Sequence, residues 1–264
     1  MRTLLRSLST ITLLAAGLLG AEPTDLVVRD GDVTLTGHVF RPAGAGAKPA
    51  VLVVHEWWGR NAYADRRAEE LTKDGYVALA VDLYGEAAQD DFPTAVARSK
   101  PFYAEPERFS RRLGLFLDAV RRQPGVDGQR VSAIGFCFGG SAVLQAARDG
   151  LDLRGVVAFH AGLGSAKPAT TTPKARILVC HGGADPFVPP ADVAKFFEEM
   201  TTAKASWRFE AYGGAVHAFT NPTAGQGVTN VPAGVPFAAA VHYDQAAETA
   251  SLAAMRTFLA DVNR

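Results

Sequence analysis

The chain has 264 residues, with 27 Lys and Arg against 27 Asp and Glu, so its formal net charge is zero. This length can bury a sizeable core, and the 48% of hydrophobic residues is ordinary for a folded protein, which excludes disorder, collagen-like repeats and disulfide-rich scaffolds. A neutral balance without runs of Lys or Arg argues against a nucleic-acid or anionic-membrane surface. Two cysteines, Cys137 and Cys180, are too few for a disulfide framework or a four-ligand zinc site.

The first residues have the pattern of a signal peptide. Arg2 and Arg6 precede an uncharged stretch, residues 8–20, which is shorter than the about 20 residues that span a bilayer. We expect residues 1–21 to be a signal peptide cleaved after Ala21, although Leu19 is bulkier than the small residue usual at that position. The alternative is an N-terminal helix packed on the fold. The pattern predicts an exported protein, periplasmic or secreted, without membrane attachment after processing.

From residue 22 on, strand-like and helix-like segments alternate. Residues 26–28 and 33–40 flank the turn dipeptide Asp30-Gly31 and predict an antiparallel hairpin. Short apolar runs, typical of strands buried on both faces of a parallel sheet, follow at 50–54, 76–81, 131–136, 156–159, 177–180 and 207–212. Helical patterns lie between or after them at 62–73, 106–122, 140–148, 191–200 and 238–259.

This alternation predicts an α/β fold with right-handed βαβ units and a doubly wound, mostly parallel sheet flanked by helices. No internal repeat or long linker divides the chain, so we expect residues 22–264 to form a single domain. Residues 213–236 form a long loop rich in Gly, Pro and Asn, and such loops are often functional.

The sequence Gly135-Phe136-Cys137-Phe138-Gly139 follows a predicted strand and precedes a helix. It has the G-x-nucleophile-x-G pattern of the nucleophile elbow in α/β-hydrolases, with Cys where Ser is commoner. So sharp a turn strains the backbone of the nucleophile, and a Cβ two residues to either side would clash. The helix dipole at this position favours a thiolate. The alternative is a glycine-rich helix start with a buried Cys.

Two later strand-to-loop segments supply partners in the order nucleophile, acid, His that this fold requires. Asp185 and His217 each follow a predicted strand, so both are expected at the carboxyl ends of parallel strands. His217 would deprotonate Cys137 and later protonate the leaving oxygen, and Asp185 would orient His217. Taken singly, Asp185 also fits a turn or capping carboxylate and His217 a surface histidine.

Glu56 ends the first parallel strand, in the loop that supplies the second oxyanion donor in such hydrolases. We expect the backbone N–H groups of Phe138 and Trp57 to be the two donors. Trp57 and Trp58 are candidates for the acyl pocket or for the core, and a salt-bridged structural role is the alternative for Glu56.

Two further residues near the motifs have a structural interpretation. His160 also ends a strand, and a structural histidine with satisfied hydrogen bonds is favoured over a catalytic role. Cys180 lies in an apolar strand and is interpreted as a small buried hydrophobe. No metal or nucleotide cofactor is implied.

In combination, these motifs make the sequence similar to the dienelactone hydrolase family. The resemblance covers about residues 25–260 and rests on VVHEWWG at 53–59, VDLYG at 81–85, GFCFGG at 135–140, HGGADP at 181–186 and GAVHAF at 214–219. It implies a monomeric α/β-hydrolase fold and a Cys–His–Asp triad matching Cys137, His217 and Asp185. It also implies that the carboxylate matching Glu56 hydrogen-bonds the resting thiol and is displaced by substrate.

The chain departs from the family where a substrate carboxylate would bind. The resemblance implies that members acting on carboxylated lactones bind the substrate carboxylate with two arginines. The corresponding positions in this chain hold Glu86 and Asn221. We expect these two residues, with Trp58 and Tyr84, to line the substrate pocket, and neutral esters or lactones to be preferred over carboxylated ones. Arg98 and Arg108 lie downstream, but nothing in the spacing directs them at Cys137.

The function predicted from the sequence is hydrolysis of a small-molecule carboxylic ester or lactone through a thioester at Cys137. A thiolate is also a good leaving group, so it suits activated acyl donors better than amides. The alternatives are an acyltransferase or peptidase on the same fold, or a non-catalytic binding protein derived from it.

Overall fold

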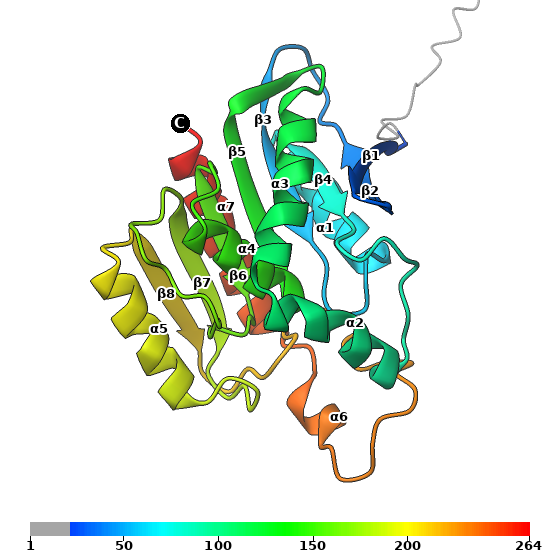
Figure 1. The fold of residues 1–264 in the computed structure, drawn as a ribbon, viewed down its shortest axis with the longest axis vertical. Helices are drawn as coiled ribbons and strands as arrows, with labels where there is room; N and C mark the ends of the chain where they lie inside the picture. The colour runs from blue at the N-terminus through cyan, green and yellow to red at the C-terminus, as the bar shows by residue number, and fades with distance from the viewer. Residues whose placement is uncertain (1–21) are drawn as a thin grey trace, which may run out of the picture.

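The computed structural model describes residues 22–264, so the predicted signal peptide at 1–21 lies outside the described residues. Eight strands form one sheet in the order β1-β2-β4-β3-β5-β6-β7-β8 (Figure 1). β1 and β2 form the predicted hairpin, β2 pairs antiparallel with β4, and all other pairs are parallel. The strands are β1 Thr24–Asp30, β2 Val33–Phe40, β3 Lys48–Val54, β4 Val77–Val81, β5 Val126–Phe136, β6 Gly155–Phe159, β7 Arg176–Gly182 and β8 Trp207–Tyr212.

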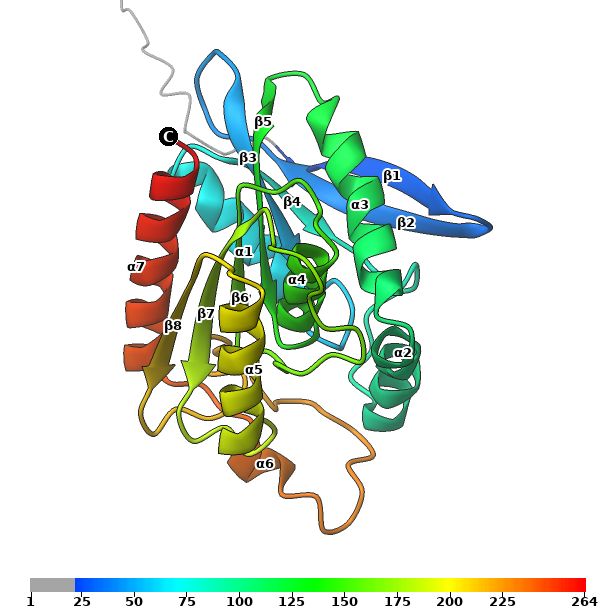
Figure 2. The ribbon, with the colours of Figure 1, turned by 60° about the vertical axis from the view of Figure 1, so that its left-hand side comes forward.

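Helices cover both faces of the sheet and enclose two apolar cores (Figure 2). One face is covered by α3 Glu107–Arg121, α4 Phe138–Arg148 and α5 Pro190–Thr202, and the other by α1 Ala62–Lys73 and α7 Gln245–Val262. The central strands β4 and β6 are buried along their whole length, as their unbroken apolar sequences predict. The prediction of a doubly wound, mostly parallel sheet flanked by helices is confirmed.

Two helical segments depart from the sequence-based expectation. α2, Phe92–Ala104, was not predicted, because Pro101 lies inside it and its apolar residues show little periodicity. Its start is nevertheless encoded, since the side chain of Asp91 accepts a hydrogen bond from the backbone N–H of Thr94. The helix expected at 238–259 is divided into α6 Phe237–Ala240 and α7, with residues 241–244 between them.

α2 and α6 lie at the lower end of the molecule in Figure 1, where the carboxyl ends of β7 and β8 also point. α2 packs against α3, where the rings of Phe102 and Phe109 lie 5.2 Å apart between centroids. No helix in residues 22–264 combines the length and apolar character needed to cross a membrane.

Candidate active site

Cys137 lies at the junction of β5 and α4 and is half-buried, with φ 54° and ψ −114°. This positive φ is a strained conformation for a residue with a side chain. The flanking glycines leave room for the turn: a Cβ on Gly135 would lie 2.0 Å from the carbonyl oxygen of Gly139, and one on Gly139 would lie 2.3 Å from that of Val54. The glycines expected from the elbow pattern are therefore required by backbone contacts.

The backbone N–H of Cys137 is held by two acceptors. It donates to the carbonyl oxygen of Phe159 at 2.9 Å and to Nδ1 of His160 at 3.1 Å. His160 is fully buried, and Nε2 of its ring lies 2.8 Å from Oγ1 of Thr220. Burial lowers the pKa of His160 well below its usual value, and the nearby charge of His217 acts in the same direction. A neutral ring that accepts at Nδ1 must carry its hydrogen on Nε2, so His160 donates to Thr220.

His160 therefore has the satisfied hydrogen bonds that the sequence favoured. Its contact with the nucleophile's own amide is an additional finding that the sequence did not show.

His217 and Asp185 form the pair that the order of motifs predicted. Nδ1 of His217 lies 2.8 Å from Oδ2 of Asp185, whose side chain is fully buried and also accepts from the backbone N–H of Phe187 at 2.9 Å. Burial acts to lower the pKa of His217, but the negative charges of Cys137 and Asp185 outweigh it and raise this pKa to about 10. The bond at Nδ1 leaves Nε2 available to the sulfur of Cys137.

The loop that carries His217 is fixed by backbone hydrogen bonds from one side. The N–H of His217 donates to the carbonyl oxygen of Ala240 at 3.1 Å, and the N–H of His242 donates to the carbonyl oxygen of His217 at 3.3 Å. Val241 and Asp244 have extended backbone, so the chain leaves the helical conformation between α6 and α7.

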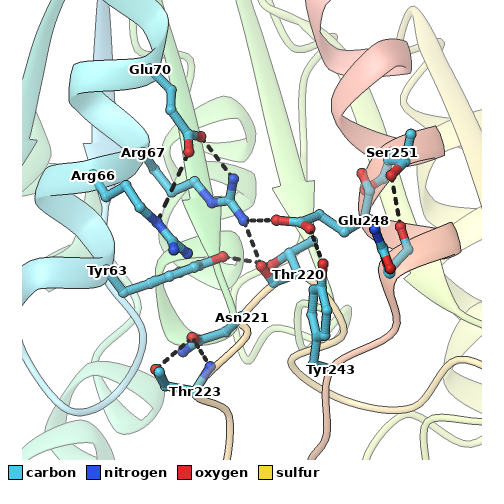
Figure 3. Close-up of polar contacts among 12 residues, drawn as sticks. Tyr63, Arg66, Arg67, Glu70, Thr220, Asn221, Thr223, Tyr243, Glu248 and Ser251 are labelled. Carbon is cyan, nitrogen blue, oxygen red and sulfur yellow. Dashed lines mark hydrogen bonds and ion pairs between the residues drawn. The ribbon is translucent and has the colours of Figure 1, made fainter.

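A buried polar network fixes the same loop from the side of α1 (Figure 3). The hydroxyl of Tyr63 lies 2.7 Å from Oγ1 of Thr220, and the guanidinium of Arg67 donates to the carbonyl oxygen of Thr220 at 2.6 Å. Arg67 also pairs with Glu248 of α7, which accepts from the hydroxyl of Tyr243. The loop with the candidate base is thereby attached to helices on one face of the sheet.

Glu56 is buried and lies in the same cavity as Cys137. Its Oε2 accepts from Nδ2 of Asn221 at 2.8 Å, and no hydrogen bond joins it to the Cys137 sulfur within residues 22–264. The resemblance implied such a bond to the resting thiol, so the structure differs at this point. Burial is the largest influence on the Glu56 carboxyl and raises its pKa to about 7, against the lowering influence of Asn221.

The two expected oxyanion donors remain available. Phe138 is the first residue of α4, where a backbone N–H has no acceptor within the helix. In the described part of the chain, the N–H of Trp57 likewise donates to no protein acceptor. The carbonyl oxygen of Trp57 accepts from the hydroxyl of Tyr84 at 3.1 Å, so Tyr84 positions the donor loop.

His55 holds the loop that carries Glu56 and Trp57 through two hydrogen bonds. Its Nδ1 is bonded to the carbonyl oxygen of Glu56, and its Nε2 accepts from the backbone N–H of Leu83 at 3.1 Å. The ring is fully buried, and burial lowers its pKa. Sequence reasoning gave His55 no role in the site.

An apolar cavity of about 540 Å³ opens above Cys137 and His217. Its lining comes from the loops after β3, β6 and β7, from the elbow after β5, from α2 and from the segment between β8 and α7. The lining residues are Glu56, Trp57, Trp58, Phe92, Val96, Ser99, Lys100, Tyr103, Cys137, Gly162, Phe187, Val188, His217, Ala218, Val235, Phe237 and Val241. Trp57 and Trp58 thus line the pocket, which is the first of the two roles, pocket or core, considered for them from the sequence.

Three residues expected in this pocket do not line it. Tyr84 does not reach the cavity and donates its hydroxyl hydrogen bond to the carbonyl oxygen of Trp57. Asn221 also does not reach the cavity and donates to the carboxylate of Glu56. Glu86 faces a different groove, where its carboxylate pairs with Arg98 at 2.6 Å. The expectation failed because a position counted from a motif does not fix the side of a loop on which the side chain lies.

Comparison with known proteins places the chain among enzymes. A family model described as the dienelactone hydrolase family matches residues 35–263. The chain belongs to the dienelactone hydrolase family. Among solved structures, a dienelactone hydrolase-like promiscuous phosphotriesterase from metagenomic libraries superposes with a TM-score of 0.81 at 33% identity, covering 91% of this chain and 98% of that one. The fold is the α/β-hydrolase fold of these dienelactone hydrolases.

Curated relatives of this dienelactone hydrolase family member include two named enzymes. A "Probable 2-oxo-3-(5-oxofuran-2-ylidene)propanoate lactonase" of Bradyrhizobium sp is 30% identical over 196 residues, which are 69% of this chain and 77% of the relative. A carboxymethylenebutenolidase of Pseudomonas putida is 30% identical over 165 residues, 58% of this chain and 69% of the relative. Family and relatives together support hydrolysis of an ester or lactone. Within residues 22–264, no three His, Cys, Asp or Glu side chains converge as a metal site would require.

Proposed function

We propose that this dienelactone hydrolase family member hydrolyses carboxylic esters or lactones through a thioester on Cys137. The observation that carries the proposal is the arrangement around Cys137: a strained cysteine at the N-terminus of α4 shares a cavity with His217, which is bonded to a buried Asp185. A cysteine, a base and a carboxylate that orients the base are the parts that nucleophilic acyl transfer needs.

In the first half-reaction, the Cys137 thiolate attacks the substrate carbonyl carbon. The oxyanion that forms is bound by the N–H groups of Phe138 and Trp57, which act as fixed hydrogen-bond donors to the developing charge. The imidazolium of His217 gives its proton to the leaving oxygen, and the carbon–oxygen bond breaks as the thioester forms.

In the second half-reaction, neutral His217 removes a proton from a water molecule, and the hydroxide attacks the thioester carbonyl. The carbon–sulfur bond breaks, the acid product leaves, and the pair returns to thiolate and imidazolium. The raised pKa of His217, about 10, supports an imidazolium at neutral pH that can give its proton to the leaving oxygen.

An acyltransferase, a peptidase and a binding protein remain the alternatives on this fold. Turnover of matched esters, lactones and amides by wild type, Cys137→Ala and Cys137→Ser separates them. We expect ester or lactone hydrolysis by wild type, none by the folded Ala variant, and weak activity of the Ser variant, because a hydroxyl is far less acidic than a thiol. Unchanged hydrolysis by Cys137→Ala would end the proposal.

A further inference from the structure

The cavity above Cys137 is large compared with a small lactone. Its volume of about 540 Å³ lies within the roughly 300–1,000 Å³ of pockets that hold drug-sized ligands. A five-membered lactone ring would leave most of this apolar space without contacts. Because an unfilled apolar cavity forgoes both hydrophobic burial and dispersion contacts, its shape suits a larger group.

One wall of the cavity is a preformed aromatic cluster. Trp57 and Trp58 lie 4.8 Å apart, Trp57 and Phe92 5.2 Å apart, and Phe92 and Phe237 5.7 Å apart, all between ring centroids. These rings come from three separate segments and belong to, or pack against, a third apolar cluster, and Trp57 also packs against one core of the sheet. The wall therefore does not depend on a ligand for its assembly.

The mouth of the cavity is also apolar. Exposed large hydrophobic side chains in residues 22–264 number six, and four of them, Val96, Tyr103, Phe187 and Val235, line this cavity. Each of the four is between 36% and 50% exposed. Scattered exposed hydrophobic residues need no explanation, but their concentration around one opening marks a site that an apolar ligand covers.

The lining offers few polar partners beyond the machinery already described. Apart from Glu56, Cys137 and His217, the polar groups on the described lining side chains are the indole N–H groups of Trp57 and Trp58 and the polar ends of Ser99, Lys100 and Tyr103. A substrate with many hydrogen-bonding groups would lose its hydration here without compensation.

We propose that the preferred substrates are neutral esters with a large apolar acyl group, which occupies this cavity. The inference rests on the proposed hydrolysis and names its substrate class. The acyl side is assigned because the acyl group stays on Cys137 through both half-reactions, whereas the alcohol leaves after the first. A wall that contacts the acyl group can therefore stabilise both transition states.

The test is the kcat/KM of p-nitrophenyl acetate, butyrate and octanoate below their aggregation concentrations. Octanoate has about six more methylenes than acetate, and full burial of each methylene raises kcat/KM by up to about fourfold. We therefore expect kcat/KM to rise by at least about tenfold from acetate to octanoate. A flat or falling series overturns the proposal. A matched series of acetate esters with lengthening alkyl alcohols should show a smaller rise, and a larger rise there would overturn the acyl assignment.

Val96→Asn tests the cavity itself, and Val27→Asn is the matched control. Both valines are exposed, but Val27 lies on β1, away from the cavity. Val96→Asn should lower the ratio of octanoate to acetate kcat/KM by about fivefold, as expected for adding a polar group to an apolar wall, and Val27→Asn should leave it unchanged. Equal ratios in both variants overturn the proposal. Mass-spectrometric trapping of an acyl group on Cys137 tests the thioester independently, so failure of either idea can be recognised.

Discussion

The amide of Asn221 donates to the carboxylate of Glu56 across 2.8 Å, and both side chains are buried beside the reacting groups. By its spacing from His217, Asn221 is expected at a position where the resemblance implies an arginine in members that act on carboxylated lactones. A neutral amide stabilises a carboxylate less than a guanidinium does. Burial therefore dominates and brings the pKa of Glu56 to about 7, so its charge changes near neutral pH.

Glu56→Gln should change the pH dependence of thiol alkylation. As pH rises through about 7, Glu56 becomes negative near Cys137 and opposes the thiolate, so wild type should show a transition there. The Gln variant should lack that transition and react faster than wild type above it. Iodoacetamide alkylation rates of substrate-free protein over roughly pH 5 to 9 check this. Glu86→Gln, outside the cavity, is the control, and overlaying Glu56→Gln and wild-type curves would leave Glu56 a structural residue.

The same carboxyl should make folding stability depend on pH. Between its unfolded value of 4.5 and about 7, Glu56 binds more protons when folded than when unfolded, so stability falls as pH rises through this window. Full ionisation costs on the order of 3 kcal/mol. Glu56→Gln should therefore gain stability relative to wild type at pH 8 and little at pH 4. Urea unfolding at both pH values measures this, and a constant difference between the proteins contradicts it.

Substrate charge should also affect the rate. At the two positions where the resemblance implies arginines, this chain has Asn221 and Glu86. Asn221 donates a hydrogen bond to Glu56, and Glu86 pairs with Arg98 outside the cavity. A carboxylated enol lactone should react with a kcat/KM roughly tenfold or more below that of its methyl ester, because its anion finds little compensation in an apolar pocket. Lys100 is the candidate cation if the anion proves the better substrate. Lys100→Met should then remove that preference.

Thr220→Val should impair catalysis without altering substrate binding. The substitution removes the acceptor of the His160 Nε2–H and also the partner of the Tyr63 hydroxyl. The unpaired buried donor forces His160 to shift beneath the Cys137 amide. We expect kcat to fall by about tenfold or more with KM little changed. Thr220→Ser retains the hydroxyl and should restore most of kcat. An equal loss in both variants would show that the methyl group, and not the hydrogen bond, matters.

Gly139→Ala should prevent the elbow from forming. Its Cβ would meet the backbone carbonyl of Val54 at 2.3 Å, a contact that only movement of β3 or α4 could relieve. We expect a loss of about 3 kcal/mol or more in the free energy of unfolding. Gly213→Ala is the control, because no atom lies within 4 Å of its added Cβ. Comparable stability of the two variants in chemical denaturation would contradict the steric argument.

The sequence predicted the sheet well because its evidence is local. Unbroken apolar runs, the hairpin turn at Gly31-Asp32 (one residue after the predicted Asp30-Gly31 dipeptide) and the glycines beside Cys137 each constrain the backbone where they occur. The arrangement of Asp185 and His217 could also be expected, since carboxyl ends of neighbouring parallel strands meet at one edge.

The hydrogen-bond network around the site and the lining of the cavity could not be predicted, because they depend on contacts between residues distant in the sequence. Tyr63 and Thr220 are 157 positions apart, and neither lies in a motif that predicts their hydrogen bond. The lining of the cavity depends on how α2 and α6 fold over the sheet, and α2 has a helix start but little apolar periodicity. His160 carried only the signal of a histidine at the end of a strand.

The proposed catalytic residues and much of the cavity wall lie on different segments, and this division affects how variants with a new substrate range could be selected. Cys137, Asp185 and His217 follow strands of the sheet, whereas much of the cavity wall belongs to α2 and to residues 231–237. Random libraries confined to the exposed lining positions of these segments would vary substrate range with little effect on the unfolding transition, because core residues such as Phe102 stay unchanged. Positions 240–242 are different, because their backbone pairs with His217. Substitutions there would alter selectivity and turnover together, so they belong in a second round of selection.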